Sequence, residues 1–209
     1  MSNTSIAPKS PPLLGATFVT SAAQWRQLPE PGPIEIAFAG RSNSGKSSAI
    51  NALARRARLA FSSRTPGRTQ QINFFVLRND AYIVDLPGYG YAAVARETKN
   101  AWQEFLWRYV TERGTLAALV LLLDIRRGLT ELDYPLLDVF LPSARPVLLL
   151  VTKADKLNRQ ERQKNLSAIC KTLAEHYRAS AEYAQTILFS ARDKTGVAEA
   201  DAIISHWMN

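Results

Sequence analysis

The sequence predicts an α/β fold: a mostly parallel, doubly wound sheet of six strands, one of them an antiparallel edge strand, with helices on both faces. Residues 40–47 read G-R-S-N-S-G-K-S, a glycine-rich loop between a short apolar run at 34–39 and a helix-compatible segment at 47–53. The runs 116–124 and 147–151 are continuously apolar, which is typical of parallel strands covered on both faces. Because helical segments alternate with these runs, the order favours a doubly wound sheet.

Length and composition favour one domain. The chain has 209 residues, of which 46% are hydrophobic and 21% charged, enough for one substantial core. We expect a disordered tail at 1–14, rich in Ser, Pro and Lys, and a single domain at 15–209. Cys170 is the only cysteine, so no intramolecular disulfide can form. With no signal-peptide core and no run of the ~20 apolar residues that span a membrane, the expected location is the cytoplasm.

The first elements are short. Residues 16–20 are compatible with an additional edge strand, and 22–28 with a helical turn whose Trp25 docks on the domain. Pro29, Pro31 and Pro33 then mark an extended entry to the strand at 34–39.

The loop at 40–47 matches the phosphate-loop pattern G-x-x-x-x-G-K-[ST]. Its glycines allow successive backbone N–H groups to point at phosphates, and the loop delivers those phosphates to a helix N-terminus. Lys46 is expected to reach the β- and γ-phosphates, and the Ser47 hydroxyl to bind magnesium. A plain Gly/Ser turn is the alternative, and the flanking strand and helix argue against it.

The polar stretch 57–71 is predicted to be a loop because it contains Pro and Gly. Nucleotide switches place here a threonine that completes the magnesium shell when the γ-phosphate is present. Thr65 and Thr69 both compete for this role, and we favour Thr69 because it lies nearer the next strand.

The runs 72–77 and 81–85 form a predicted antiparallel hairpin around 78–80. The second run ends in D-L-P-G, with Asp85 followed by Gly88. This is a Walker-B arrangement: Asp85 would orient magnesium through water, and the Gly88 amide would bond the γ-phosphate.

Three longer helices and a closing one are predicted. The helix at 98–113 has an apolar stripe of Trp102, Phe105, Leu106, Tyr109 and Val110, with Trp107 at its edge. A helix at 131–141 separates the two apolar strands. The helix at 159–177 has Leu166, Ile169, Cys170, Leu173 and Tyr177 on one face, which predicts Cys170 in the core. The last helix, at 196–208, closes the sheet.

The strand at 147–151 leads into T-K-A-D, residues 152–155. The Asp155 carboxylate can accept hydrogen bonds from N1–H and N2–H₂ of guanine, a pair that adenine does not offer. Lys153 would lie along the base and brace the phosphate loop. Thr152 replaces the asparagine of the common motif, which leaves one loop-bracing hydrogen bond in question. A strand at 186–189 ends before Ser190 and Ala191, whose backbone amides are expected at the guanine O6.

The net charge of +8 is concentrated in one region. No acidic residue lies between Glu35 and Asp80, a stretch with eight basic residues, whereas acidic and basic residues balance in the rest of the chain. This basic segment, 41–78, exceeds the needs of one nucleotide and suggests a polyanionic partner such as RNA. A merely solvated arginine-rich face is the alternative.

Together, G-R-S-N-S-G-K-S, T-P-G-R-T-Q at 65–70, D-L-P-G-Y-G at 85–90, T-K-A-D and F-S-A at 189–191 resemble the motifs of the bacterial EngB (YihA/YsxC) GTPases, of the Era/EngA-like branch. The resemblance implies a Ras-like P-loop GTPase domain that binds GTP and GDP with Mg²⁺ and hydrolyses GTP slowly. It also implies a role in assembly of the large ribosomal subunit, a requirement for normal division and septation, and Thr69 as the magnesium residue.

On these grounds we assign Lys46, Thr69 and Gly88 to catalysis and Ser47, Thr69 and Asp85, the last through water, to the metal. The full nucleotide site is expected to comprise Gly40, Arg41, Ser42, Asn43, Ser44, Gly45, Lys46, Ser47, Gly67, Arg68, Thr69, Gln70, Gln71, Asp85, Leu86, Pro87, Gly88, Thr152, Lys153, Ala154, Asp155, Phe189, Ser190 and Ala191.

Tyr89 stands where Ras-like enzymes have a water-orienting glutamine, which predicts slow intrinsic hydrolysis. By similarity to related GTPases, Asn43 is a candidate K⁺ ligand. We expect a monomer whose partner is the large ribosomal subunit or its assembly intermediate. A division-associated scaffold with protein partners is the alternative, and no inserted segment is large enough to build the acceptor pocket of a kinase.

Overall fold

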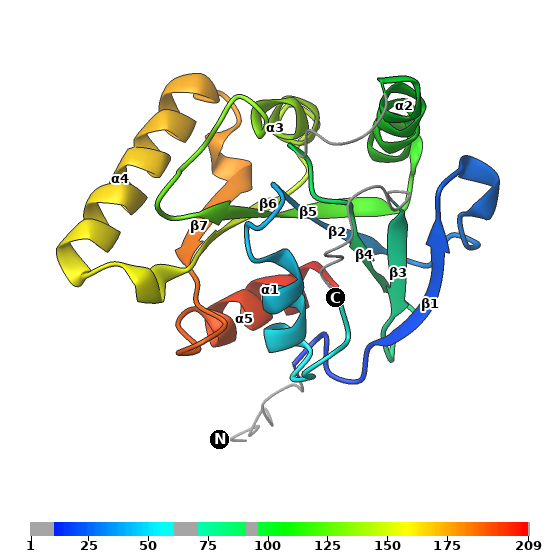
Figure 1. Cartoon of the computed structure of the whole chain (residues 1–209), viewed down its shortest axis with the longest axis horizontal. Helices are drawn as coiled ribbons and strands as arrows, with labels where there is room; N and C mark the ends of the chain where they lie inside the picture. Colours follow the sequence, from blue (N-terminus) through cyan, green and yellow to red (C-terminus); the bar gives the residue numbers. More distant parts are fainter. Residues whose placement is uncertain (1–10, 61–70, 91–95, 209) are drawn as a thin grey trace, which may run out of the picture.

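In the computed structural model, the described residues are 11–60, 71–90 and 96–208, and side chains are described from residue 103 within the last range. These residues form a seven-stranded sheet in the order β1-β3-β4-β2-β5-β6-β7 (Figure 1). The strands are β1 Thr17–Ala22, β2 Glu35–Gly40, β3 Ile72–Val76, β4 Tyr82–Asp85, β5 Leu116–Asp124, β6 Val147–Thr152 and β7 Ala184–Leu188. The α-helices are α1 Lys46–Leu53, α2 Arg96–Glu112, α3 Tyr134–Phe140, α4 Arg159–His176 and α5 Val197–Trp207, and short 3₁₀ helices are η1 Trp25–Gln27, η2 Ala154–Lys156 and η3 Ala181–Tyr183.

The predicted α/β class is confirmed, but the strand count and the position of the antiparallel strand are corrected. Strands β4, β2, β5, β6 and β7 are parallel, and β3 runs antiparallel to both of its neighbours. One edge of the sheet is β1, which pairs with β3 from Thr17 opposite Val76 to Ala22 opposite Ile72. Packing supports this pairing, because the rings of Phe18 and Phe75 meet edge to face at 5.8 Å.

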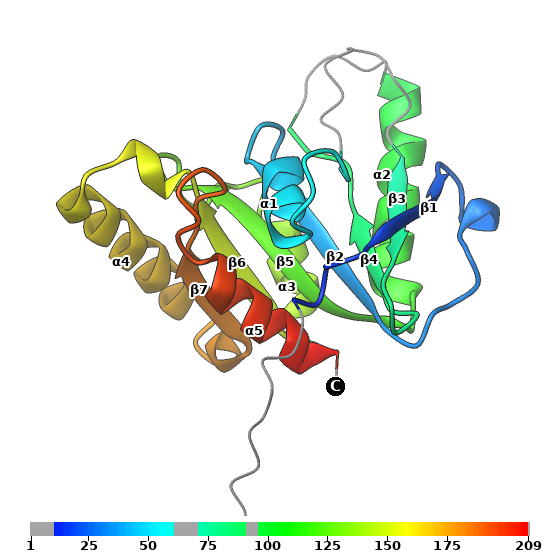
Figure 2. The ribbon, with the colours of Figure 1, turned by 90° about the horizontal axis from the view of Figure 1, so that it is seen from below.

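Two apolar layers enclose the sheet. Alternate residues of β2 point to opposite faces, so Ile36 and Phe38 join one core cluster while Ala37 and Ala39 join the other. Helices α1 and α5 cover the first face, and α2, α3 and α4 cover the second (Figures 1 and 2). This two-sided cover explains why β5 and β6 are apolar at every position before their last residues, Asp124 and Thr152.

The helical stripes are mostly as predicted, with one correction. Phe105, Leu106, Tyr109 and Val110 of α2 are buried, and Trp107 packs at the core edge; Trp102 lies outside the described side chains. Cys170 of α4 is exposed, not buried in the core as predicted.

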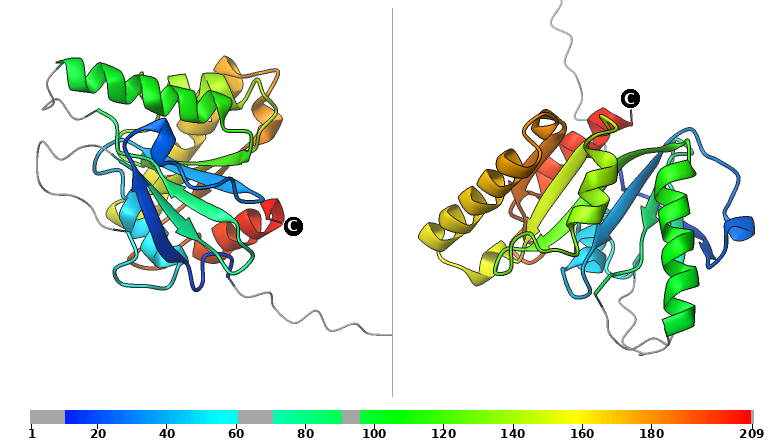
Figure 3. Two further views of the ribbon diagram at one scale, coloured as in Figure 1. Left: turned by 90° about the vertical axis from the view of Figure 1, so that its right-hand side faces the viewer. Right: turned by 90° about the horizontal axis from the view of Figure 1, so that it is seen from above.

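The exposure of Cys170 follows from the position of its helix. Helix α4 lies beside the edge strand β7 (Figure 3). It therefore buries only a narrow stripe, in which Ile169 and Leu173 are one turn apart. Cys170 is rotated by about 100° from Ile169, beyond that stripe.

The described part of the chain begins a few residues before residue 15, the predicted start of the domain. Residues 1–10 lie outside the described part, but residues 11–14 form a turn in which Leu13 is fully buried. Trp25 of η1 packs against the core as predicted, and the Arg108 guanidinium lies 4.2 Å from its ring centroid. Among the described helices, none has both the length and the apolarity to cross a bilayer.

A buried carboxylate joins the start of β2 to the end of α2. Glu35 is fully buried and accepts hydrogen bonds from Tyr109 Oη at 2.6 Å, Thr115 Oγ1 at 2.9 Å and the Arg113 guanidinium at 2.6 and 2.9 Å. These bonds satisfy both carboxylate oxygens, which a buried charge requires. The contact fixes the end of the sheet opposite the loops described next.

Candidate functional site

Five chain segments meet at one edge of the sheet. Strands β2, β4, β5, β6 and β7 are parallel, so their carboxyl ends lie together. They deliver Gly40, Asp85, Asp124, Thr152 and the residues after Leu188 to this edge. In doubly wound sheets this edge is where ligands bind.

The phosphate loop has the predicted strand–loop–helix form. Strand β2 ends at Gly40 and α1 begins at Lys46, with Gly45 as its N-cap at φ 100°. This left-handed conformation explains the glycine, since a side chain would be strained there. Asn43 also has a positive φ of 64°, a conformation that asparagine tolerates better than most residues.

Lys46 and Asp85 form an ion pair at the centre of the site. The Lys46 ammonium donates to Asp85 Oδ1, and both side chains are largely buried, at 12% and 5% exposure. The Asn73 amide lies 3.5 Å from the other Asp85 oxygen. Ser47 follows in the first turn of α1, so the donors available for a metal are a hydroxyl and a carboxylate. Such hard oxygen donors fit Mg²⁺.

The backbone after Asp85 lies directly on the phosphate loop. The Ser42 amide donates to the Tyr89 carbonyl at 2.9 Å. A Cβ on Gly88 would come within 3.1 Å of Ser42 Cα and 3.2 Å of Ser42 N, so only glycine fits without displacing the loop. Gly88 therefore packs directly on the phosphate loop, and its predicted hydrogen bond to the γ-phosphate stays a prediction.

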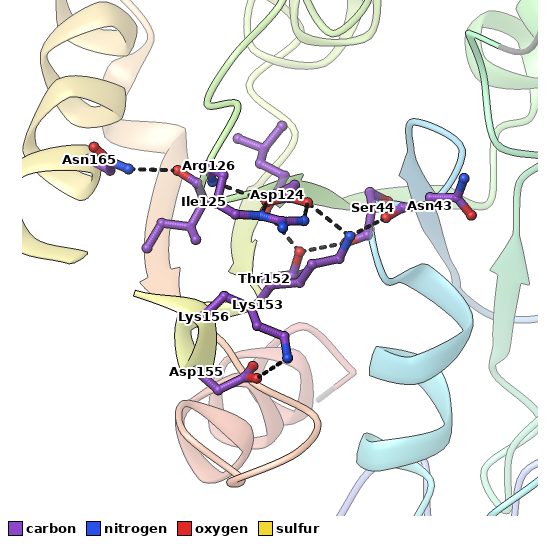
Figure 4. Close-up of polar contacts among 11 residues, drawn as sticks. Asn43, Ser44, Asp124, Ile125, Arg126, Thr152, Lys153, Asp155, Lys156 and Asn165 are labelled. Atoms are coloured by element: carbon purple, nitrogen blue, oxygen red, sulfur yellow. Dashed lines mark hydrogen bonds and ion pairs between the residues drawn. The ribbon is translucent and has the colours of Figure 1, made fainter. Parts of the chain in front are cut away.

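Thr152 provides the loop-bracing hydrogen bond that its replacement of asparagine had left in question. Its hydroxyl lies 2.5 Å from the Ser44 carbonyl and 3.0 Å from that of Leu123 (Figure 4). The adjacent Lys153 braces the loop as predicted, donating to the Asn43 carbonyl at 2.6 Å. The T-K pair thus ties the end of β6 to two consecutive carbonyls of the phosphate loop.

Asp124 was not predicted as part of this network. Its carboxylate accepts from Lys153 Nζ at 2.8 Å and from the Arg126 guanidinium at 2.6 and 2.9 Å (Figure 4). Burial is the largest influence and raises the pKa of Asp124, but the hydrogen bonds from Arg126 and Lys153 together outweigh it and hold that pKa well below its usual range. The sequence signal was an acid ending an apolar strand at the same edge as Asp85.

Asp155 lies just after β6, at the same edge of the sheet as the phosphate loop, where its carboxylate could bind the base of a nucleotide. It is the second residue of η2, the short helix that Lys153 caps. The Ser190 hydroxyl donates to Asp155 Oδ1 at 2.9 Å, and this hydrogen bond orients the carboxylate. Of the two amides expected at the guanine O6, that of Ser190 is instead bonded to the Thr195 carbonyl at 3.0 Å. The amide of Ala191 therefore remains the candidate.

The other predicted site residues divide into two groups. Gln71, Leu86, Pro87, Ala154 and Phe189 are described; Gln71 is exposed just before β3, and Leu86, Ala154 and Phe189 are buried. Thr65, Gly67, Arg68, Thr69 and Gln70 lie outside the described residues. Across the described part of the chain, no group of three or more His, Cys, Asp or Glu side chains is arranged to hold a metal.

Comparison with known proteins agrees with this site. Residues 35–153 match the model of a family described as 50S ribosome-binding GTPase. The chain is 50% identical over 198 residues to a probable GTP-binding protein EngB of Thiobacillus denitrificans, covering 95% of this chain and 93% of that one. It is 46% identical to the Dechloromonas aromatica counterpart, covering 93% and 87% of the two chains.

Solved structures show the same fold. A crystal structure of a probable GTP-binding protein engB superimposes with a TM-score of 0.63 at 23% identity, covering 83% of this chain and 97% of that one. The family model spans the phosphate loop, Asp85 and the start of T-K-A-D, and the curated relatives match nearly end to end. The chain therefore belongs to the EngB family of GTP-binding proteins and is a GTPase.

Proposed function

We propose that this GTPase is a nucleotide switch in assembly of the large ribosomal subunit, and that it contacts ribosomal RNA through its basic segment, residues 41–78. The observation that carries the proposal is the charge of this segment. It lies in a stretch without acids, and four of its five described arginines are exposed, namely Arg55, Arg56, Arg58 and Arg78, while Arg41 is partly buried. Exposed cations beside a nucleotide site suit a partner rich in phosphates. The family description, 50S ribosome-binding GTPase, favours the same partner.

In this proposal the nucleotide is GTP or GDP with Mg²⁺. Ser47, Thr69 and, through water, Asp85 would hold the ion, which neutralises phosphate charge when bound. Lys46 would bind the β- and γ-phosphates and the Gly88 amide the γ-phosphate. Asp155 would select guanine through its carboxylate. GTP would order the loop containing Thr69 and the segment after Asp85, and the ordered surface would dock on RNA.

Hydrolysis is proposed to be slow, because Tyr89 replaces a water-orienting glutamine. A potassium ion near Asn43 would compensate for missing positive charge at the phosphates. The exposed position of Asn43 in the phosphate loop supports this assignment. If sodium stimulated hydrolysis as well as potassium does, the assignment of Asn43 as a K⁺ ligand would be rejected. K⁺ stimulation that persists in Asn43→Ala would reject it as well.

The second candidate is a division-associated scaffold that uses nucleotide to control protein partners. In the favoured proposal, by contrast, loss of the protein impairs division and septation because ribosome assembly fails. The protein then acts in the cytoplasm and as a monomer. Salt dependence separates the two, since RNA binding weakens steeply with salt.

The test is co-sedimentation of the purified protein with ribosomal subunits in GDP or a non-hydrolysable GTP analogue, over a salt series. We expect retention on the large subunit with the GTP analogue and a steep loss as salt rises. Absence of retention in both nucleotide states, on mature subunits and on assembly intermediates, would reject the ribosomal function.

A further inference from the structure

Helices α1 and α5 pack side by side on one face of the sheet (Figures 1 and 2), and residues from both elements line a groove between them. Its volume is about 760 Å³. Small-molecule pockets typically span about 300–1,000 Å³, so a nucleotide-sized group fits. Asn51, Arg55 and Arg56 line it from the end of α1, and Lys194 and Asp201 from α5 and the turn before it.

The rim of the groove is cationic. Arg55 and Lys194 are exposed and both have left-handed backbones, with φ of 52° and 68°. Arg56 is held in place, since its Nη1 donates to the Ala16 carbonyl at 2.8 Å. Three cations along one groove favour an anionic ligand.

The floor of the groove carries an unsatisfied acceptor. Asp201 is 9% exposed, and its Oδ1 is buried without a hydrogen-bond partner in the described part of the chain. No described Lys, Arg or His nitrogen lies within ion-pairing distance of this carboxylate. A buried acceptor without a donor is costly, so the groove is suited to a ligand that brings one.

The cationic rim and the unsatisfied acceptor of Asp201 together limit the chemical class of ligand that suits the groove. Phosphate alone satisfies the cations but has no donor for Asp201 when it is a phosphodiester. A nucleotide carries both groups: a phosphate and, on its sugar or base, O–H or N–H donors. Unpaired RNA offers both its 2′-hydroxyls and the Watson–Crick edges of its bases, whereas in a duplex those Watson–Crick edges are occupied by base pairing.

We propose that the groove binds one nucleotide of single-stranded RNA, with its phosphate against Arg55, Arg56 and Lys194 and a sugar or base donor on Asp201. This inference rests on the proposed function, because it takes RNA as the partner, and it adds two residues outside the basic segment, Lys194 and Asp201. The groove also borders the base-reading loop, since Lys194 Nζ donates to the Ala191 carbonyl at 3.1 Å.

The first test measures binding of the full-length, GDP-loaded protein to a fluorescein-labelled, mixed-sequence single-stranded RNA by anisotropy over a salt series. The variant Arg55→Gln/Lys194→Gln removes two rim charges. The control Arg159→Gln/Lys164→Gln removes two exposed charges from α4. We expect the groove variant to bind about tenfold or more weakly, and its salt slope to fall by about 1.4, because two contacts to single-strand phosphates are lost. Equal affinities of the two double variants would overturn the proposal.

The second test uses the sign of a charge effect. Asp201→Leu removes a negative charge, so simple electrostatics predicts tighter RNA binding. The proposal predicts weaker binding instead, because the acceptor is lost. A thermal melt checks folding, and we expect no loss of stability because a buried unsatisfied carboxylate is removed. Unchanged or tighter binding by a folded Asp201→Leu protein would overturn the role of Asp201.

Failure of this inference can be told apart from failure of the ribosomal function. If wild-type protein and the groove variant are retained equally on the large subunit, the function stands and the groove is not its RNA contact. If the groove variant loses the subunit but keeps its RNA-oligonucleotide affinity, the groove contacts a ribosomal protein and the RNA proposal is wrong. If no protein is retained but the oligonucleotide binds through the groove, the inference stands without the ribosomal function.

Discussion

The Tyr89 hydroxyl donates a 2.5 Å hydrogen bond to Oδ1 of Asp133, at the start of α3. Asp133 is fully buried, and its other oxygen accepts from the Thr130 amide at 2.8 Å and hydroxyl at 2.7 Å. Burial, and then the charge of Asp133, raise the pKa of Tyr89 well above its usual range, so the hydroxyl remains a donor. Both residues line a cavity of about 360 Å³ beside the phosphate loop. The bond ties the segment after Asp85 to α3.

Tyr89→Phe therefore tests whether this hydroxyl is structural. The change leaves a buried carboxylate oxygen without its donor, so we expect the free energy of unfolding to fall by about 1–3 kcal/mol. Because the hydroxyl is committed to Asp133, we expect single-turnover GTP hydrolysis to stay within about twofold of wild type. Tyr183→Phe, at a half-buried tyrosine of η3, is the matched control. A large loss of hydrolysis without loss of stability would assign the hydroxyl to the chemistry.

Thr152→Val removes the hydroxyl that braces the phosphate loop and keeps the side-chain shape. Since the Ser44 carbonyl then loses its donor, we expect fluorescent GDP to bind about tenfold more weakly, equivalent to about 1.4 kcal/mol. Thr152→Asn should retain affinity, because its amide can donate to the same carbonyl. Thr186→Val on β7 controls for loss of a hydroxyl elsewhere in the sheet. Equal GDP affinity of Thr152→Val and Thr186→Val would show that the brace does not matter for binding.

Asp155→Asn tests guanine selection. An amide cannot accept both guanine N–H groups, and mispaired buried polar groups cost a site about 10⁴–10⁵ in discrimination. We expect GDP affinity to fall by at least two orders of magnitude and xanthosine diphosphate, whose C2 oxygen accepts the amide N–H, to bind better than GDP. Competition titration with both nucleotides measures the ratio. The control is Asp193→Asn, which lies on the exposed turn after Ser190. If Asp155→Asn still preferred GDP to xanthosine diphosphate, the assignment of Asp155 as the residue that selects guanine would be rejected.

Asp201 predicts a pH dependence of stability. Burial raises its pKa to about 6, against about 3.9 in an unfolded chain, and the charge of Arg55 lowers it by less. A raised carboxyl pKa means that the folded state binds more protons between these values, so stability falls as pH rises from about 4 to about 6. We expect the free energy of unfolding of wild type relative to Asp201→Asn to fall by about 2 kcal/mol between about pH 4 and 7.

Denaturant titrations at several pH values measure this difference. Asp80→Asn is the control, since Asp80 is exposed in the hairpin turn with a φ of 61° that asparagine accepts. A parallel pH profile for wild type and Asp201→Asn would contradict the raised pKa.

Much of the fold was predictable because its signals are local. The apolar runs of β5 and β6, the Gly45 turn into α1 and the hairpin of β3 and β4 each depend on nearby residues, and all are present. Cys170 was wrongly placed in the core because helical spacing specifies a face but not how wide a stripe the neighbouring sheet covers. The seventh strand was uncertain for a similar reason: residues 16–20 are short, and pairing with β3 depends on a segment more than fifty positions away.

By itself, the sequence determined the α/β class, the phosphate loop, the acid at the end of β4 and the T-K-A-D motif at the end of β6, since each is specified by residue types at fixed short spacing. Only the tertiary structure decided that Thr152 braces Ser44, that Asp124 joins Lys153 to Arg126 and that Tyr89 bonds Asp133. It also decided that Asp201, whose Oδ1 has no hydrogen-bond partner among the described residues, lines a groove with Arg55 and Lys194. Most of those relationships join residues far apart in the chain, such as Thr152 with Ser44 and Tyr89 with Asp133. They arise where parallel strands end together or two helices pack, so they depend on distances that no local pattern encodes.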